Sequence, residues 1–481
     1  MKRDYISYLF LAVVIIAGII IYNPFLLYFQ NDDFIHIPLS AQGELFQHNS
    51  FRPICDLSVM LDYTIWGKNA YGYHITNLIL HCINCLLVYL FTKKISQRYK
   101  IFNENKYAAA VTALLFFIYA NHSEAVFWIL GRSAMLGFFF FMLSCIFYLE
   151  RAKKIYFIIS IVFAMLAWLS YESTWVLPIV FFAIMFSDNV TGSPVYLKQN
   201  ALNKEKINAV IILICFAVYL IARRFVTGEW IGSYESGGTK EISWISILEN
   251  IFRLSIRSWL PPNENGTIFI AAALILFLIF AVVLIRLKRN SKVIYLLVMA
   301  LWLVSLMPYV VLGIDTKGTE SERFLYLPAL FTCFILVVLI TQIRKQSIRD
   351  ISMVAIIILQ LIMLNTNKNH YRFSGSVTQT FIRAVNQFPA GSKFIIDSVP
   401  QECRGALIYR LGFTDCFKWM APNDSLIQWT QKHNDLILHN DYKSKIIKDP
   451  TGRFNNMPGN MNDRSAYMQF SDSVLWIYLP Q

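Results

Sequence analysis

The strongest constraint on the fold is a series of long apolar runs that recur along the first three quarters of this 481-residue chain. A helix that crosses a hydrocarbon layer about 30 Å thick needs roughly 20 residues, most of them apolar. Charged residues make up only 15% of the chain, whereas an average soluble domain carries about 25%. We therefore predict an α-helical polytopic membrane protein.

About eleven segments qualify as spans, although several are short, so two of them could be re-entrant. They are residues 5–28, 71–92, 107–120, 133–150, 155–170, 173–187, 207–226, 267–287, 291–312, 323–342 and 351–365. The first segment could instead be a signal peptide. It is long and lacks a convincing small-residue cleavage site, so we expect it to be retained.

The distribution of Lys and Arg predicts the orientation. With the N-terminus in the cytoplasm, the inner segments carry 20 basic residues, and the outer loops before residue 366 carry 10. Basic residues concentrate in cytoplasmic loops of membrane proteins, which favours this orientation. We expect a transmembrane domain (1–365) with an extracytoplasmic loop (29–70), and a small extracytoplasmic C-terminal α/β domain (366–481). The membrane is expected to be a bacterial inner membrane.

The formal net charge of +13 does not indicate a nucleic-acid-binding protein. The basic residues lie in short loops between apolar runs, rather than along one surface or groove. The charge therefore orients the chain in a membrane, and no nucleic acid is expected among its partners.

The eight cysteines give no firm evidence of a metal site. Cys82 and Cys85 stand beside His81 at a spacing that could bind a metal, but no other ligand cluster completes the site. Cys403 and Cys416 could pair if the C-terminal region faces an oxidising compartment. No cofactor is assigned, and a divalent metal ion is kept as an alternative.

Acidic and basic side chains gather at the outer ends of the predicted spans. Asn31-Asp32-Asp33-Phe34 places two adjacent carboxylates after the first span, which costs desolvation and mutual repulsion. Further polar residues at this depth are Arg52, Asp56, Asp62, His74, Asn77, His122, Glu124, Trp128, Arg132, Glu172, Glu320, Glu322 and Arg323. Each alone is compatible with a solvated loop or a headgroup anchor, but the inner side shows no matching set.

This arrangement suits sugar transfer from a polyprenyl phosphate. The reaction needs a base for the acceptor hydroxyl, and cations for the charge that grows on the leaving phosphate. Aspartate suits the first role, and the fork-shaped guanidinium group of arginine suits the second. The donor headgroup lies at the bilayer surface, so its site is expected at the ends of spans.

Four stretches also carry a resemblance to a known family. They are Asn31-Asp32-Asp33-Phe34; Phe51-Arg52-Pro53 followed by Tyr71-Gly72-Tyr73-His74-Ile75-Thr76-Asn77-Leu78; His122-Ser123-Glu124-Ala125-Val126-Phe127-Trp128-Ile129-Leu130-Gly131-Arg132; and Glu322-Arg323-Phe324-Leu325-Tyr326-Leu327-Pro328. In these stretches the chain resembles the GT-C superfamily of polyprenyl-phosphate-sugar-dependent glycosyltransferases. Within it, the chain is most similar to the membrane region of the transmembrane and tetratricopeptide-repeat O-mannosyltransferases and their bacterial relatives.

The resemblance covers roughly residues 5–340 and has two departures. Leu169-Ser170-Tyr171-Glu172 resembles the family's Ser-Lys-Glu turn, with Tyr171 in place of the basic residue. No tetratricopeptide period is visible in the C-terminal region, which puts protein O-mannosylation in doubt.

The resemblance implies a role for each candidate residue. Asp32 would be the catalytic base, and Asp33 would orient the acceptor or Asp32 itself. Three residues would hold the donor phosphate: Arg52, Arg323 and His74. Three others would bind the sugar or the acceptor: Glu124, Arg132 and Glu172.

We therefore expect a GT-C-like glycosyltransferase that moves a hexose or pentose from a polyprenyl-phosphate donor in the membrane lipid to an extracytoplasmic acceptor. The acceptor would be a glycan, a lipid-linked glycan or a protein. The alternative is a transporter or flippase of lipid-linked sugars. Transporters usually place ionisable residues near the bilayer midplane in two related halves, and this pattern is not seen here.

Overall fold

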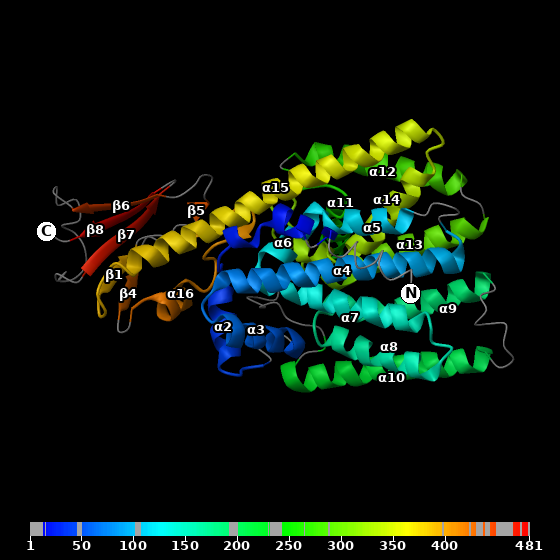
Figure 1. The fold of residues 1–481 in the computed structure, drawn as a ribbon, viewed down its shortest axis with the longest axis horizontal. Coiled ribbons are helices and arrows are strands. Elements are labelled where there is room, and N and C mark those ends of the chain that lie inside the picture. The colour runs from blue at the N-terminus through cyan, green and yellow to red at the C-terminus, as the bar shows by residue number, and fades with distance from the viewer. Residues whose placement is uncertain are drawn as a thin grey trace.

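The computed structural model shows an elongated molecule with a bundle of helices at one end and β-strands at the other (Figure 1). It describes residues 13–14, 16–45, 51–101, 107–191, 201–228, 230, 243–263, 265–286, 289–396, 399–422, 425–429, 436–437, 443–448, 465–471 and 474–479. We call the end of the bundle nearest the strands the outer end, and the opposite end the inner end.

The bundle consists of apolar helices that run between these two ends. They are α4 (Ala70–Tyr99), α5 (Ala108–Phe117), α7 (Arg132–Tyr148), α8 (Lys154–Trp168), α9 (Leu177–Thr191), α10 (Ala201–Thr227), α12 (Gly266–Arg286), α13 (Arg289–Leu306), α14 (Pro328–Thr341) and α15 (Gln346–Val385). Short helices join them at the outer end: α6 (Ser123–Phe127), α11 (Trp244–Arg257) and the 3-10 segments η5 (Glu172–Val176) and η7 (Glu322–Leu325).

Among the described residues, six helices are long and apolar enough to cross a membrane, and a seventh span forms if the bent pair Ala108–Phe117 and Ala120–Phe127 counts as one. Four shorter apolar helices accompany them: Ile16–Leu26, Lys154–Trp168, Gly266–Val282 and Pro328–Thr341. Each predicted span overlaps one of these helices. The protein is an integral membrane protein, and the count of eleven spans stays a prediction.

The expected outer loop 29–70 contains two helices, α2 (Asp33–Ala41) and α3 (Pro53–Trp66). Proline at the first position of α3 fits a helix start, because its missing N–H has no partner there. Gly67 ends the same helix with φ +55°, a conformation that favours glycine. Asp33 and Arg52 therefore lie at the starts of these two helices.

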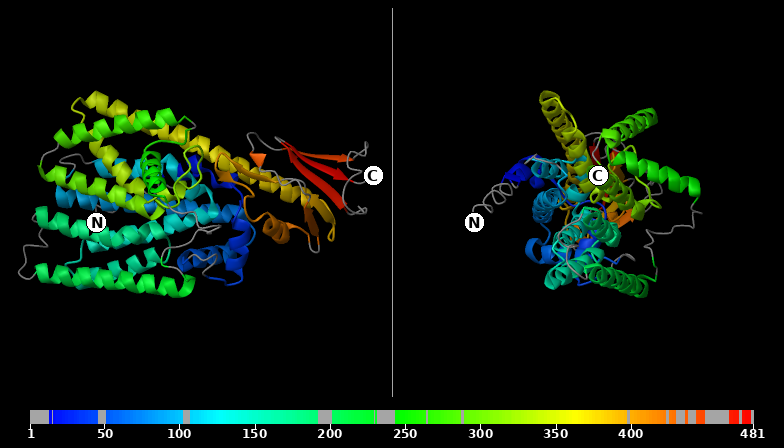
Figure 2. Two further views of the ribbon diagram at one scale, coloured as in Figure 1. Left: turned by 180° about the vertical axis from the view of Figure 1, so that it is seen from behind. Right: turned by 90° about the vertical axis from the view of Figure 1, so that its right-hand side faces the viewer.

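Helix α15 has 40 residues, far more than the predicted span 351–365. At 1.5 Å per residue it is about 60 Å long, roughly twice the thickness of the hydrocarbon layer. It runs from the inner end of the bundle to the strands (Figures 1 and 2). The expected domain boundary at residue 365 thus falls inside a continuous helix.

The described C-terminal residues form two sheets and α16 (Phe413–Met420). The five-stranded sheet has the order β4-β1-β7-β8-β6, and the three-stranded sheet has the order β3-β2-β5. The strands are β1 (Lys393–Ile396), β2 (Pro400–Cys403), β3 (Ala406–Leu407), β4 (Leu426–Trp429), β5 (Leu436–Ile437), β6 (Lys443–Lys448), β7 (Ser465–Ser471) and β8 (Val474–Leu479). In the larger sheet β7 and β8 are antiparallel, and the other pairs are parallel.

One hydrophobic core joins the C-terminal region to the outer end of the bundle. The ring of Trp419 lies 5.2 Å from the ring of Phe29 and 6.2 Å from that of Phe34, measured between centroids. Phe34 also contacts Tyr409. The segment that follows the first membrane helix is thus buried against α16 and its neighbours.

The inner end of the bundle holds a network of buried ion pairs. Asp188 of α9 pairs with Arg98 of α4 (Nε–Oδ1 2.6 Å) and with Arg151 (Nη2–Oδ2 2.8 Å). Arg151, in the turn between α7 and α8, also pairs with Glu205 of α10 (Nε–Oε1 2.9 Å). The expectation that the inner side carries no matching set of charges is therefore wrong, because acids at the inner helix ends meet the basic residues there.

Candidate active site

The predicted acidic pair lies where the chain turns into α2, and its two members differ in environment. Asp33 is completely buried, and its Oδ2 accepts a hydrogen bond from the backbone N–H of Gln30 (2.9 Å). Asp32 is partly exposed, and its Oδ1 accepts from the side-chain amide of Asn31. Of the two carboxylates, Asp32 is therefore the more accessible.

Burial raises the pKa of Asp33 well above its usual range, and the neighbouring charge of Asp32 adds to this rise. The N–H groups of Gln30 and Leu130 and the charge of Arg132 act in the opposite direction. Desolvation penalises the charged form of a carboxyl group, so Asp33 ionises less readily than an exposed aspartate. The pair thus combines a buried acid with an accessible one.

Arg52, at the start of α3, is held by Glu172 of η5. Its Nε lies 2.9 Å from Oε2 of Glu172 and its Nη2 lies 2.8 Å from the same oxygen. Arg223 of α10 approaches Oε1 of Glu172 at 3.4 Å, so two guanidinium groups share one carboxylate. The side chain of Arg52 remains 17% exposed.

Arg323 of η7 is held by Glu124 of α6 in a similar way. The backbone N–H of Arg323 donates to Oε2 of Glu124 (2.9 Å), and its guanidinium group pairs with Oε1. The guanidinium group also lies over the ring of Trp128, 5.2 Å from its centroid. The side chain of Arg323 is 14% exposed.

A row of aromatic rings connects these two arginines. Arg52 lies over the ring of Tyr171, 4.7 Å from the centroid, and Tyr171 lies 6.0 Å from Tyr309. Tyr309 stacks on Phe324 at 4.0 Å, and Arg323 lies over Phe324 at 4.9 Å. Tyr171, where the sequence departs from the family pattern, therefore supports Arg52.

A third arginine–glutamate pair, next to Arg323 in the chain, was not predicted from the sequence. Arg257 of α11 binds Oε1 of Glu322 (2.7 Å) and the carbonyl oxygens of Leu260 and Asp315. Burial raises the pKa of Glu322 to about 8, although Arg257 opposes the rise. Arg257 ends a strongly amphipathic segment of the loop 227–266, and that pattern could have identified it.

Arg132 is almost completely buried at the start of α7. It pairs with Oδ2 of Asp62 (2.5 Å), and it donates to Oδ1 of Asn77 (2.7 Å) and to the carbonyl oxygen of Tyr73 (3.1 Å). These contacts join α3, α4 and α7. Arg132 thus connects helices at the outer end, and a contact with substrate stays a prediction.

His74 is buried near the outer end of α4, and its Nε2 lies 3.3 Å from the carbonyl oxygen of Tyr28. The structure therefore places His74 next to the chain that leads into the acidic pair. Its predicted contact with the donor phosphate stays untested.

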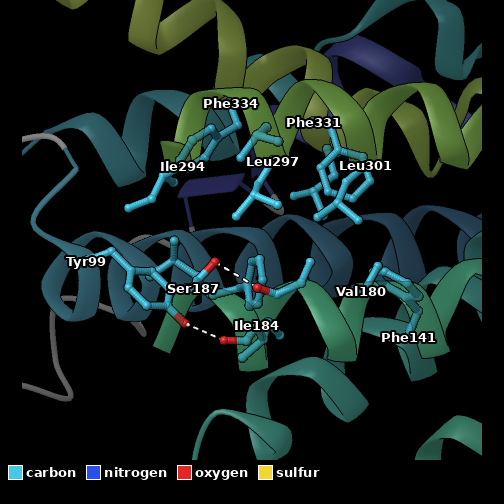
Figure 3. Close-up of a pocket in the computed structure, with 15 residues that line it drawn as sticks. Tyr99, Phe141, Val180, Ile184, Ser187, Ile294, Leu297, Leu301, Phe331 and Phe334 are labelled. Carbon is cyan, nitrogen blue, oxygen red and sulfur yellow. Dashed lines mark hydrogen bonds between the residues drawn. The ribbon is translucent and has the colours of Figure 1, made fainter. Parts of the chain in front are cut away.

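An apolar pocket lies between α4, α7 and α9 on one side and α13 and α14 on the other (Figure 3). Val180, Leu301 and Phe331 are among the side chains that line it. Its polar side chains, Tyr99 and Ser187, come from the inner ends of α4 and α9. The outer ends of α9 and α14 adjoin the segments that carry Glu172 and Arg323.

The described residues contain no group of three or more His, Cys, Asp or Glu side chains that could hold a metal ion. His81 instead bonds to the hydroxyl of Tyr326 (2.7 Å) and that of Tyr22 (3.0 Å). Cys403 and Cys416 are free thiols in the hydrophobic core.

Comparison with known proteins supports the resemblance over part of the chain. Protein O-mannosyl-transferase TMTC1 of Mus musculus is 37% identical over 102 residues, which are 21% of this chain and 10% of that protein. The TMTC1 of Homo sapiens is 36% identical over 109 residues, 22% of this chain and 12% of that protein. Protein O-mannosyl-transferase TMTC3 of Homo sapiens is 31% identical over 131 residues, 27% of this chain and 13% of that protein.

This chain is similar to protein O-mannosyl-transferases. The matched part spans about a tenth of the length of these relatives, and no family model matches the chain.

Proposed function

We propose that this protein is an integral-membrane glycosyltransferase that transfers a sugar from a polyprenyl phosphate to the hydroxyl of an extracytoplasmic acceptor. One observation carries the proposal: an accessible aspartate and two partly exposed arginines lie on loops and short helices at one end of a membrane bundle. Similarity to protein O-mannosyl-transferases supports the same reaction.

Asp32 is proposed as the general base. It would take the proton of the acceptor hydroxyl while the acceptor oxygen bonds to the anomeric carbon of the sugar. The bond from that carbon to the phosphate oxygen breaks in the same step. The accessibility of Asp32 supports this choice, and so does the burial of Asp33, which raises its pKa and disfavours the charged form that a base needs.

Arg52 and Arg323 are proposed to bind the donor phosphate and to stabilise the charge that the leaving phosphate gains. Glu172 and Glu124 hold the guanidinium groups in place, and Tyr171 and Phe324 support them from the side. Such preorganised donors are effective because they need not reorient during the reaction.

The apolar pocket is proposed to receive part of the prenyl chain of the donor. Helices α9, α13 and α14 line it, and their outer ends adjoin Glu172, Tyr309 and Arg323. A prenyl chain whose phosphate lies at the two arginines would therefore extend between these helices toward the inner end of the bundle. The apolar lining matches the chemistry of such a chain.

The names of the relatives make mannose the first sugar to test and a protein hydroxyl the first acceptor. The experiment uses the purified full chain in detergent with a polyprenyl-phosphate mannose. Mass spectrometry measures free polyprenyl phosphate and mannosylated Ser/Thr peptide. Turnover in detergent, where no gradient exists, would separate a transferase from a transporter.

Asp32→Asn should lower turnover by about 10²- to 10⁴-fold, which is the range for loss of a general base. Glu44→Gln is the matched control, because Glu44 is an exposed acid at the end of α2 in the same outer segment. Donor cleavage by Asp32→Asn at the wild-type rate would remove Asp32 from the base role. No cleavage by the wild type would contradict the transferase proposal itself.

A further inference from the structure

Asn31 has an unusual backbone conformation next to the proposed base. Its φ is +48°, in the left-handed region that residues other than glycine seldom adopt, although asparagine tolerates it better than most. It is also only 1% exposed. A buried polar residue in this conformation requires partners that hold it there.

Those partners belong to the C-terminal region, more than 370 residues away along the chain. The backbone N–H of Asn31 donates to the carbonyl oxygen of Ile408 (2.8 Å), and its Oδ1 accepts from the backbone N–H of Leu411 (2.7 Å). The remaining polar group of its side chain, the Nδ2 amide, donates to Oδ1 of Asp32. Asn31 thus joins the C-terminal chain to the proposed base.

The backbone contact is close enough to require glycine at residue 412. Gly412 has φ +74°, and a Cβ atom there would lie 2.5 Å from the carbonyl oxygen of Asn31. Any larger residue would therefore push the loop of Asp32 away, in addition to straining its own backbone.

The same C-terminal segment also holds the loop that leads into Arg323. The backbone N–H of Thr319 donates to the carbonyl oxygen of Arg404 (3.1 Å). Arg410 makes two contacts with the carboxylate of Glu320, at 2.5 and 3.0 Å. Residues 404–412 therefore contact both the loop of the proposed base and the loop of a proposed phosphate ligand.

We propose that Asn31 is a positioning residue for Asp32, and that residues 404–412 act as a clamp that fixes the base relative to the phosphate-binding loop. This inference rests on the proposed function. The amide of Asn31 orients the Asp32 carboxylate, and the clamp holds Asn31 in its left-handed conformation. A base displaced by about 1 Å can lose roughly 100-fold in rate, so such a clamp would be reflected in kcat.

Asn31→Gly tests the side-chain step, because glycine accepts the left-handed backbone and loses only the side-chain hydrogen bonds. We expect kcat to fall about 10- to 100-fold while the KM for polyprenyl-phosphate mannose changes little, since Asn31 is only 1% exposed and its side-chain groups already bond to Leu411 and Asp32. Asn31→Asp keeps an oxygen for Leu411 but loses the donor to Asp32, so it should not restore kcat. A wild-type kcat for Asn31→Gly would overturn the positioning role.

Gly412→Ala tests the clamp, with Gly391→Ala as its matched control. Both glycines have left-handed φ values, +74° and +77°, but a Cβ at Gly391 meets nothing within 4 Å. Hydrogen exchange of the full chain in detergent should show faster exchange in residues 27–36 for Gly412→Ala only. Equal exchange in both variants would overturn the clamp.

These results separate the inference from the proposed function. If Asp32→Asn is inactive while Asn31→Gly is fully active, the inference fails and the proposed function stands. Hydrogen exchange needs no turnover, so it decides whether the clamp exists even if the transferase proposal is wrong.

Discussion

The two ends of the helical bundle both carry arginine–carboxylate pairs, but they build them differently. At the inner end, Asp188 and Arg151 are fully buried and belong to one network that joins long helices. The outer end also has the buried pair Arg257–Glu322, but there Arg52 and Glu172 remain partly exposed, and they come from a helix start and a short 3-10 segment. Clustered charge alone therefore does not indicate a site. Charge on short, accessible segments is the better evidence.

The largest effect is expected at the inner end. Asp188→Asn removes the charged partner of Arg98 and leaves Arg151 with Glu205 alone, and breaking a buried pair typically costs about 3–5 kcal/mol of unfolding free energy. Turnover per folded molecule should stay near the wild-type value. Unfolding in detergent and donor turnover are measured on the same preparation. A stable but inactive Asp188→Asn variant would contradict the view that the inner network is structural and the outer pairs are functional.

Arg52→Lys should produce the next largest effect. Lysine keeps the charge but loses the planar fork that binds a carboxylate or phosphate with two N–H groups. We expect kcat/KM for the donor to fall about 10- to 100-fold. Arg253→Lys is the matched control, because Arg253 is an exposed arginine on α11 paired with Glu249. Equal losses in both variants would argue against a phosphate contact.

A smaller effect is expected for Asp33→Asn. Burial raises the pKa of Asp33 and so disfavours its charged form, and an amide is a neutral group of nearly the same shape. We expect turnover to fall less than about tenfold, far less than for a lost general base. Loss of activity equal to that of Asp32→Asn would show that Asp33 must ionise.

The smallest effect concerns pH and Glu322. The folded-state pKa of this acid, about 8, lies above its usual value, so the stability linked to its neutral form is lost as pH rises through 8. Glu322→Gln should remove that part of the decline. Thermal unfolding of both proteins at pH 6 and pH 8.5 provides the measurement. Identical pH dependence would contradict the raised pKa.

Much of the bundle was predictable, because each span repeats one signal, a long apolar run. Two other parts carried weaker signals. Helix α2 contains a proline and mixes polar and apolar residues, so the sequence predicts a loop for the outer segment 29–70. The span predicted within α15 ends at residue 365, because the hydropathy of the sequence falls there although the helix continues.

The sequence indicates Arg52, Glu124, Glu172 and Arg323 as outer-end candidates but not which of them pair, and their roles in catalysis stay predictions. Arg52 and Glu172 are 120 residues apart, and Arg323 and Glu124 are 199 apart. Such pairs depend on how the helices pack, which no local pattern records. The ion pairs of the inner network are not predictable for the same reason, since each of its acids alone resembles an ordinary charged residue near a helix end.

The continuity of α15 has a consequence for how this architecture could vary. Each residue of an α-helix turns the chain by about 100° and advances it by about 1.5 Å. Inserting one residue midway along α15 would therefore swing everything beyond it around the helix axis. Only insertions of nearly whole turns, such as seven residues, would keep the sheet in its present orientation about the helix axis. Even those would move the sheet about 10 Å farther from the bundle.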